Sequence, residues 1–273
     1  AENFLVYPRD IETAFGAAPQ FARLVALLAA HTRVRNINVL SYSAGGTVAS
    51  DGLARLATVA RARHLDPRLG QIHHAAPDAD FRGFVGDLRD YAGLADRVTV
   101  SLNMSDSALR LSQALNRASR AGRPDLRELS PGELRFLQQA NRDLGLEIVR
   151  VRPGDLPGVS DRSHLFWYMD PWAASDVILQ LLFGLDAPAR GLAPGPGASG
   201  LDYWVFPPDY EARLPAVLAR ASAKAKASAG LREPPVPEER PDLPDAGGVD
   251  RHQAVGNGHD DMVGHPVQPG RRN

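Results

Sequence analysis

The chain has 273 residues, a formal net charge of −1 at pH 7 and no cysteine. Its length suits one large α/β domain or two small ones, and a hydrophobic content of 44% is ordinary for a globular protein. These values exclude a disulfide framework, a thiolate metal site and a cysteine nucleophile, and they do not favour nucleic acid as a partner.

The predicted elements alternate between strands and helices up to about residue 185. A strand at 4–7 is stopped by Pro8, and Pro19 opens the first helix. Further strands are expected from residue 37 and over 71–76, 98–102 and 146–151, and further helices over 47–63, 81–94 and 106–120, after residue 130, and from 171 to 184. This alternation predicts a mostly parallel sheet with helices on both faces, which binds ligands at the carboxyl ends of its strands.

Local signals mark several of the helix ends. Ser105 is a plausible N-cap of the helix over 106–120, and Ser130 with Glu133 predicts a capping box. Asp170 followed by proline is typical of a helix start. The longest apolar runs, 24–30 and 177–185, are too short for a transmembrane helix, which needs roughly 18 residues.

The sequence INVLSYSAGG, residues 37–46, has the outline of a nucleophile elbow. An apolar strand leads to Ser43, and a helix follows almost at once. The strained turn of an elbow needs small neighbours, which Ser41, Gly45 and Gly46 provide. At the start of the helix, the amide of Ala44 is the candidate donor to a developing oxyanion.

A serine nucleophile needs a base and an acid that orients the base. In a doubly wound hydrolase these follow in the order Ser, Asp or Glu, His. Ser43, Asp106 and His164 satisfy that order, and Asp106 and His164 each follow a predicted strand. We therefore expect these three residues to form a triad, with Asp78 as an alternative acid because it also follows a strand.

Other readings of these residues stay open. Ser43 could lie in an ordinary turn, while a phosphate loop or dinucleotide site is disfavoured because its glycine and lysine signals are absent. Asp106 could simply favour a helix dipole, Asp80 could replace it as the acid, and His164 could be an ordinary surface or core histidine. The aromatic residues of 166–172 could line an acyl pocket or pack in the core.

The remaining histidines are weaker candidates. His31, His64, His73 and His74 precede the proposed acid and so break the chain order. His73 and His74 resemble a metal pair, but neighbouring strand residues point to opposite faces. The three histidines after residue 250 could form a weak adventitious metal site, although a solvated tail is the favoured reading, and no metal or cofactor is expected.

Four segments together resemble a bacterial α/β-hydrolase family of uncharacterised function: SYSAGG, the PDAD loop, ADRVTVSLNMSDSALRLS and SHLFWYMDPWAASDVILQLLFG. The resemblance covers about 4–185 and implies the α/β-hydrolase fold, with Ser43 as nucleophile, Asp106 as acid and His164 as base. Members typically carry G-H-S-x-G at the elbow, where this chain has serine and tyrosine in the first two positions.

The resemblance also implies that the first strands are missing. In this fold an upstream strand leads into a loop that donates the second oxyanion amide, and that strand lies beside the strand starting at Ile37. We therefore expect an N-terminally truncated chain that either leaves a gap at that place in the sheet or pairs two strands that are not normal neighbours. The compartment, cytoplasmic or exported, is left open.

The composition divides the chain into four parts. The hydrolase domain is expected over 1–186, a linker rich in Ala, Pro and Gly over 187–200, an aromatic and helical extension over 201–228, and a disordered tail over 229–273. The predicted function is a serine hydrolase that cleaves small-molecule carboxylic esters through an acyl-enzyme. The alternative is a non-catalytic hydrolase-fold module that binds a partner, and neither protein partners nor oligomeric state can be predicted.

Overall fold

The structure is a computed structural model that describes residues 7–152 and 154–229. Its six strands form one sheet in the order β1-β2-β3-β4-β6-β5. They are β1 (Ile37–Tyr42), β2 (Leu69–Ala75), β3 (Ala95–Asn103), β4 (Leu146–Val151), β5 (Ala193–Pro194) and β6 (Trp204–Val205). All neighbouring pairs are parallel except β5 with β6. The mostly parallel sheet with its helices is the α/β-hydrolase architecture that was predicted.

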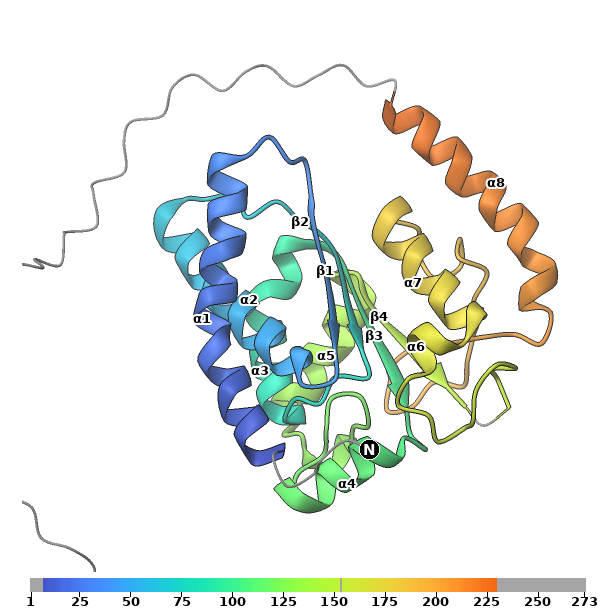
Figure 1. Cartoon of the computed structure of the whole chain (residues 1–273), viewed down its shortest axis with the longest axis horizontal. Helices are drawn as coiled ribbons and strands as arrows, with labels where there is room; N and C mark the ends of the chain where they lie inside the picture. The colour runs from blue at the N-terminus through green and yellow to red at the C-terminus, as the bar shows by residue number, and fades with distance from the viewer. Residues whose placement is uncertain (1–6, 153, 230–273) are drawn as a thin grey trace, which may run out of the picture. The chain divides into compact units, whose positions relative to one another are not determined.

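Helices cover both faces of the sheet (Figure 1). On one side lie α1 (Tyr7–His31), α2 (Gly45–Arg63), α3 (Phe81–Tyr91) and α5 (Pro131–Asp143), and on the other lie the short α6 (Phe166–Met169), α7 (Pro171–Phe183) and α8 (Tyr210–Ala229). The helix α4 (Ser107–Asn116) follows β3, and two short 3-10 helices lie at Ala92–Leu94 and Leu126–Glu128. No helix in the described part of the chain is both long and apolar enough to cross a bilayer.

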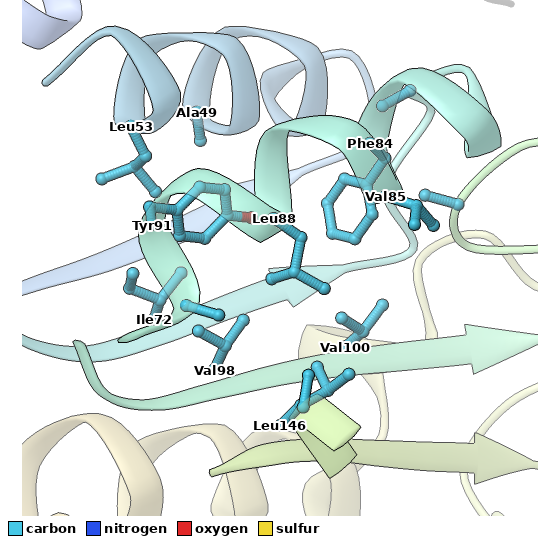
Figure 2. Packing of buried hydrophobic residues seen from close by; sticks show 14 of the residues in the cluster. Ala49, Leu53, Ile72, Phe84, Val85, Leu88, Tyr91, Val98, Val100 and Leu146 are labelled. Atoms are coloured by element: carbon cyan, nitrogen blue, oxygen red, sulfur yellow. The ribbon is translucent and has the colours of Figure 1, made fainter. Parts of the chain in front are cut away.

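The main core lies between the sheet and the helices α2, α3 and α5 (Figure 2). Fully buried apolar side chains from α2, β2 and α3 meet here, among them Leu53, Ile72 and Leu88. A small apolar cavity of about 40 Å³ lies within this cluster, and it is lined by core side chains such as Val100 and Leu137 rather than by the predicted site residues. The apolar side chains of these helices thus cover this face of the sheet.

The first predicted strand and the start of the first helix are wrong where the structure describes them. Tyr7 belongs to α1, which passes through Pro19, while 4–6 lie outside the described residues. An apolar stripe explains the earlier start, because it begins before Pro19, faces α2 and runs along α1 at Ala14, Ala18, Ala22, Val25 and Ala29. Packing of that stripe outweighs the hydrogen bond that a proline removes from a helix.

Most other elements agree with the prediction, and the ends of α4 do not. β4 and α7 have the predicted bounds, and the capping box of Ser130 and Glu133 is present. The N-cap of α4 is Asp106 rather than Ser105, because the Asp106 side chain accepts a bond from the Leu109 amide. α4 ends at Asn116 because Arg117 takes a left-handed conformation with φ of 54°.

The stretch 187–200 differs from the expected linker. Ala187 and Arg190 are fully buried, and β5 lies within the stretch. The following β6 extends the sheet beside β4, and α8 packs on α7. Residues 7–229 thus belong to one compact unit, while the predicted tail beyond residue 229 lies outside the described residues.

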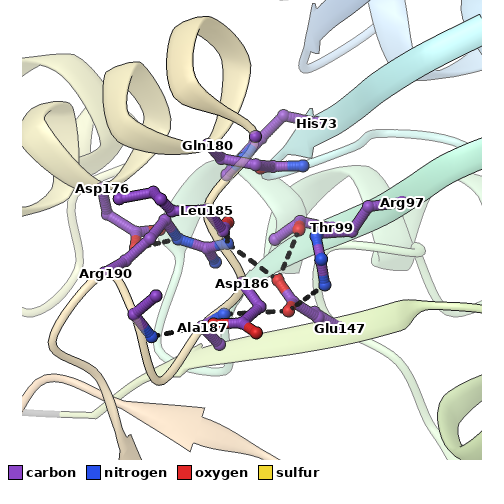
Figure 3. Close-up of polar contacts among 12 residues, drawn as sticks. His73, Arg97, Thr99, Glu147, Asp176, Gln180, Leu185, Asp186, Ala187 and Arg190 are labelled. Carbon is purple, nitrogen blue, oxygen red and sulfur yellow. Dashed lines mark hydrogen bonds and ion pairs between the residues drawn. The ribbon is translucent and has the colours of Figure 1, made fainter. Parts of the chain in front are cut away.

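A buried charge network fixes this stretch to the sheet (Figure 3). Arg190 donates to Asp176 on α7 at 2.6 Å and to Glu147 on β4 at 2.8 Å. Glu147 also accepts from Arg97 on β3 at 2.6 Å and from the Ala187 amide at 2.9 Å. Two cations and two carboxylates therefore neutralise one another beneath the stretch.

β1 lies at one edge of the sheet in the described part of the chain. It pairs in parallel with β2. The upstream strand that the resemblance implies on the other side of β1 stays a prediction.

Candidate active site

Ser43 lies in the turn between β1 and α2 with the backbone of a nucleophile elbow. Its φ is 52°, a left-handed conformation that is costly for a residue with a side chain. The turn holds Ser43 in place through its own carbonyl, which accepts bonds from the amides of Gly46 and Asp78, both at 2.8 Å. Two backbone hydrogen bonds thus stabilise the left-handed conformation of Ser43, and one of them comes from the loop after β2.

Gly46 is required by close packing, and Gly45 is not. A Cβ at Gly46 would lie 2.6 Å from Pro77 Cβ and 3.0 Å from Pro77 Cα. A Cβ at Gly45 would meet nothing within 4 Å. Of the two glycines predicted to permit the turn, Gly46 therefore lets the elbow approach the loop after β2.

Ser43, His164 and Asp106 form a continuous hydrogen-bonded line. His164 Nε2 lies 2.8 Å from Ser43 Oγ, and His164 Nδ1 lies 2.6 Å from Asp106 Oδ2. The Asp106 side chain is fully buried and the His164 side chain is 11% exposed. The structure thus brings together the three residues predicted from chain order, with the half-buried Ser43 at one end and the fully buried Asp106 at the other.

The loop that carries His164 is tied to the end of β3. Asn103 Nδ2 donates to the carbonyl oxygens of Asp161 and Ser163, both at 3.0 Å. Asp106 keeps its other oxygen on the Leu109 amide at 3.0 Å, so its carboxylate has a fixed orientation. Fixed neighbours of this kind hold an imidazole in one tautomer and one direction.

The carboxylate of Asp78 binds residues other than His164. Its carboxylate accepts from Arg120 Nε at 2.5 Å and from Ser112 Oγ at 2.6 Å, and all three residues are buried. Both ring nitrogens of His164 already contact Ser43 and Asp106. The structure therefore places Asp106 beside the histidine, and Asp78 supports the elbow through its backbone.

Asp80, the other alternative acid, also has a different partner. Its side chain caps α3 by accepting a hydrogen bond from the Gly83 amide.

Ala44 precedes the first residue of α2, as an oxyanion donor would. Within the described part of the chain its amide makes none of the turn hydrogen bonds, whereas Gly46 and Thr47 donate to the carbonyls of Ser43 and Ala44. The position is compatible with donation to a substrate oxygen near Ser43.

In the comparison with family models, residues 1–146 match a family described as "Alpha/beta hydrolase of unknown function (DUF900)". The chain belongs to this family. The matched segment contains Ser43 and Asp106 and ends before His164. No curated protein and no solved structure matches the chain.

In this alpha/beta hydrolase, Ser41 stands where the usual elbow motif has glycine, and its hydroxyl has a buried partner. Ser41 Oγ lies 2.6 Å from Nδ1 of His74, its neighbour in the register of β1 with β2. His74 Nε2 lies 3.0 Å from the Tyr91 hydroxyl. A polar residue at position 41 is thus satisfied by a buried histidine on the next strand.

His73 and His74 of the hydrolase point to opposite faces of the sheet, as their adjacent positions predict. His73 contacts Gln180 on α7 and Ser101 on β3, at 2.6 and 2.7 Å. Burial lowers the pKa of His73 to about 4 and that of His74 to about 3, so both are neutral near pH 7. Among the described residues no cluster of three metal-ligating side chains occurs.

The aromatic residues after His164 divide between core and site. Phe166 is buried, and Trp172 packs against Tyr210 with ring centroids 5.5 Å apart. Trp167 and Tyr168 instead contact Tyr42, at 5.4 and 6.3 Å between centroids. The Tyr42 ring also lies 5.0 Å from the His164 ring. Sequence reasoning missed this role of Tyr42, although its place directly before Ser43 was a signal.

Proposed function

We propose that this alpha/beta hydrolase is a serine hydrolase that cleaves carboxylic esters through an acyl-enzyme. Ser43 Oγ attacks the ester carbonyl carbon while His164 Nε2 takes the hydroxyl proton. The carbon–oxygen bond to the alcohol then breaks, and His164 returns the proton to the leaving oxygen. Water attacks the acyl-enzyme by the same path and releases the acid with Ser43 restored.

The hydrogen-bonded line from Asp106 through His164 to Ser43 carries this proposal. A neutral hydroxyl is a weak nucleophile near pH 7, and a base within hydrogen-bond reach removes that obstacle. The buried Asp106 carboxylate lies at Nδ1 of His164, where it would stabilise the imidazolium formed as the proton moves. Ala44 would donate its amide to the oxyanion, helped by the N-terminal end of α2.

The test is labelling by a fluorophosphonate, which reacts with activated serines. We expect wild-type protein to be labelled and Ser43→Ala not to be. Ser175→Ala is the control, because this serine lies on α7 and its hydroxyl donates a hydrogen bond to the Pro171 carbonyl. Labelling that survives Ser43→Ala would refute the assignment, and a folded wild-type protein without labelling or ester turnover would favour the non-catalytic binding module.

A further inference from the structure

Three aromatic side chains form a surface beside His164, which we call the aromatic wall: Tyr42, Trp167 and Tyr168. Their ring centroids lie between 5.1 and 6.3 Å from one another. Tyr42 joins the wall to the imidazole, at 5.0 Å between centroids. The wall therefore begins at the group that would deliver a proton to the leaving oxygen.

The wall is held in place from both ends of the short helix α6. Phe166 is 1% exposed and anchors the helix in a core cluster. The buried carboxylate of Asp170 accepts from the amides of Gly158, Trp172 and Ala173. Trp167 and Tyr168 lie between these anchors, so the backbone that carries them is held at both ends.

The outer part of the wall faces solvent. Tyr168 is 46% exposed. Leu165, the N-cap of α6, is 37% exposed, and Met169, its last residue, is 56% exposed. An apolar group that covers these side chains would remove apolar surface from water, which is favourable in proportion to the area. Exposed apolar surface of this kind next to reacting groups is typical of a ligand-binding groove.

The chemistry of the proposed reaction decides which part of an ester would lie there. His164 Nε2 gives its proton to the leaving oxygen, so the alcohol must lie beside the imidazole, while the carbonyl oxygen must lie near the Ala44 amide. We infer that the aromatic wall binds the alcohol portion of the ester and selects apolar alkyl or aryl leaving groups. This inference rests on the proposed function and specifies its substrate class.

Two ester series test the inference: acetates of alcohols from methyl to hexyl, and methyl esters of acids from acetic to hexanoic. For wild type we expect kcat/KM to rise along the alcohol series. Tyr168→Ala should lower kcat/KM for hexyl acetate about 3- to 10-fold, the effect of one aromatic contact, and change it little for methyl acetate and for the acid series. Tyr168→Phe, which keeps the ring, should behave as wild type.

Deacylation separates substrate binding from a general structural effect. All acetates give the same acetyl-enzyme, from which the alcohol has already left, so Tyr168→Ala should leave the deacylation rate unchanged. The control is Leu182→Ala, which removes a side chain that is 73% exposed near the far end of α7. It should match wild type on both series.

Three results would overturn the inference. They are an equal loss on both series, a larger loss on the acid series, and no loss on either. If wild type hydrolyses none of the esters and takes no fluorophosphonate, the proposed function fails, and the inference fails with it. Because labelling does not depend on the alcohol series, the two failures are distinguishable.

Discussion

At the scale of single residues, the site depends on where each carboxylate is held. Asp106 and Asp78 both follow strands, which is why the sequence alone left Asp78 as an alternative acid, and the structure buries both of them. Their partners separate them, since Asp106 contacts His164 and Asp78 contacts Arg120. No local pattern carries those partners, because each lies far away in the chain.

Substitution of the two aspartates tests this separation. Asp106→Asn should lower kcat by roughly 10³- to 10⁴-fold, because the amide cannot hold the imidazole in the required tautomer or stabilise its charge. Asp78→Asn should mainly lower the free energy of unfolding, because it leaves Arg120 buried without its anion. Ester turnover and urea unfolding of both variants provide the measurements, and the reverse pattern would move the acid to Asp78.

The buried histidines predict an acid-sensitive fold. The pKa of His73 in the folded state, about 4, lies below the unfolded value of 6.5, so the unfolded chain binds more protons between these values. The free energy of unfolding should therefore fall as pH drops from 6.5 towards 4, by roughly 1.4 kcal/mol per pH unit for each such histidine. Urea unfolding at pH 7, 6 and 5 measures the slope. His73→Gln should flatten it, and an unchanged slope in that variant would contradict the account.

At the scale of elements, the elbow is positioned by the loop after β2. Pro77 packs against Gly46, and the Asp78 amide donates to the Ser43 carbonyl. Thr47 Oγ1 adds a bond to the Asp78 carbonyl at 3.1 Å. The strained serine thus rests on contacts between two successive strand-to-helix turns.

The two elbow glycines form a matched pair for this contact. Gly46→Ala should lower the free energy of unfolding by roughly 1–3 kcal/mol, because its Cβ would overlap the backbone and ring of Pro77. Gly45→Ala should cost much less, since its Cβ meets nothing within 4 Å and alanine favours a helix. Thermal and urea unfolding of the pair decide the matter, and equal losses would show that packing against Pro77 is not the cause.

Sequence reasoning succeeded where signals were local and failed where distant contacts decide. The capping box at Ser130 and the stop at Gly184 act within one turn of a helix, and the elbow motif is similarly short. The start of α1 was missed because packing on α2 decides it. The end of α4 was missed for a local reason, since Arg117 takes a left-handed conformation that its residue type does not signal. The aromatic wall could not be predicted either, since Tyr42 meets Trp167 only in three dimensions.

At the scale of the whole molecule, the segment after α7 extends the sheet beyond β4. Its composition resembles a linker, but Arg190 carries the charge that holds Glu147 and Asp176 in the interior. The segment continues into β6, which pairs with β4, and into α8. The described hydrolase fold therefore extends well past the boundary at residue 186 that composition suggested.

Removal of the Arg190 charge tests this integration. Arg190→Met should lower the free energy of unfolding by roughly 3–5 kcal/mol, because it leaves the buried Asp176 carboxylate without its cation. The control is Arg55→Met, which breaks an exposed pair with Asp51 on α2 and should cost about 1 kcal/mol or less. Urea unfolding of both variants compares them, and similar costs would mean that the network does not hold the segment.

The most direct test of the central claim is to trap the acyl-enzyme and locate the acyl group. The protein is mixed with p-nitrophenyl acetate, quenched in acid, digested and mapped by mass spectrometry. The account predicts an acetyl group on Ser43 in wild type, none in Ser43→Ala and a strong decrease in His164→Ala. An acetyl group found on another residue, or turnover that is equal in wild type and Ser43→Ala, would contradict it.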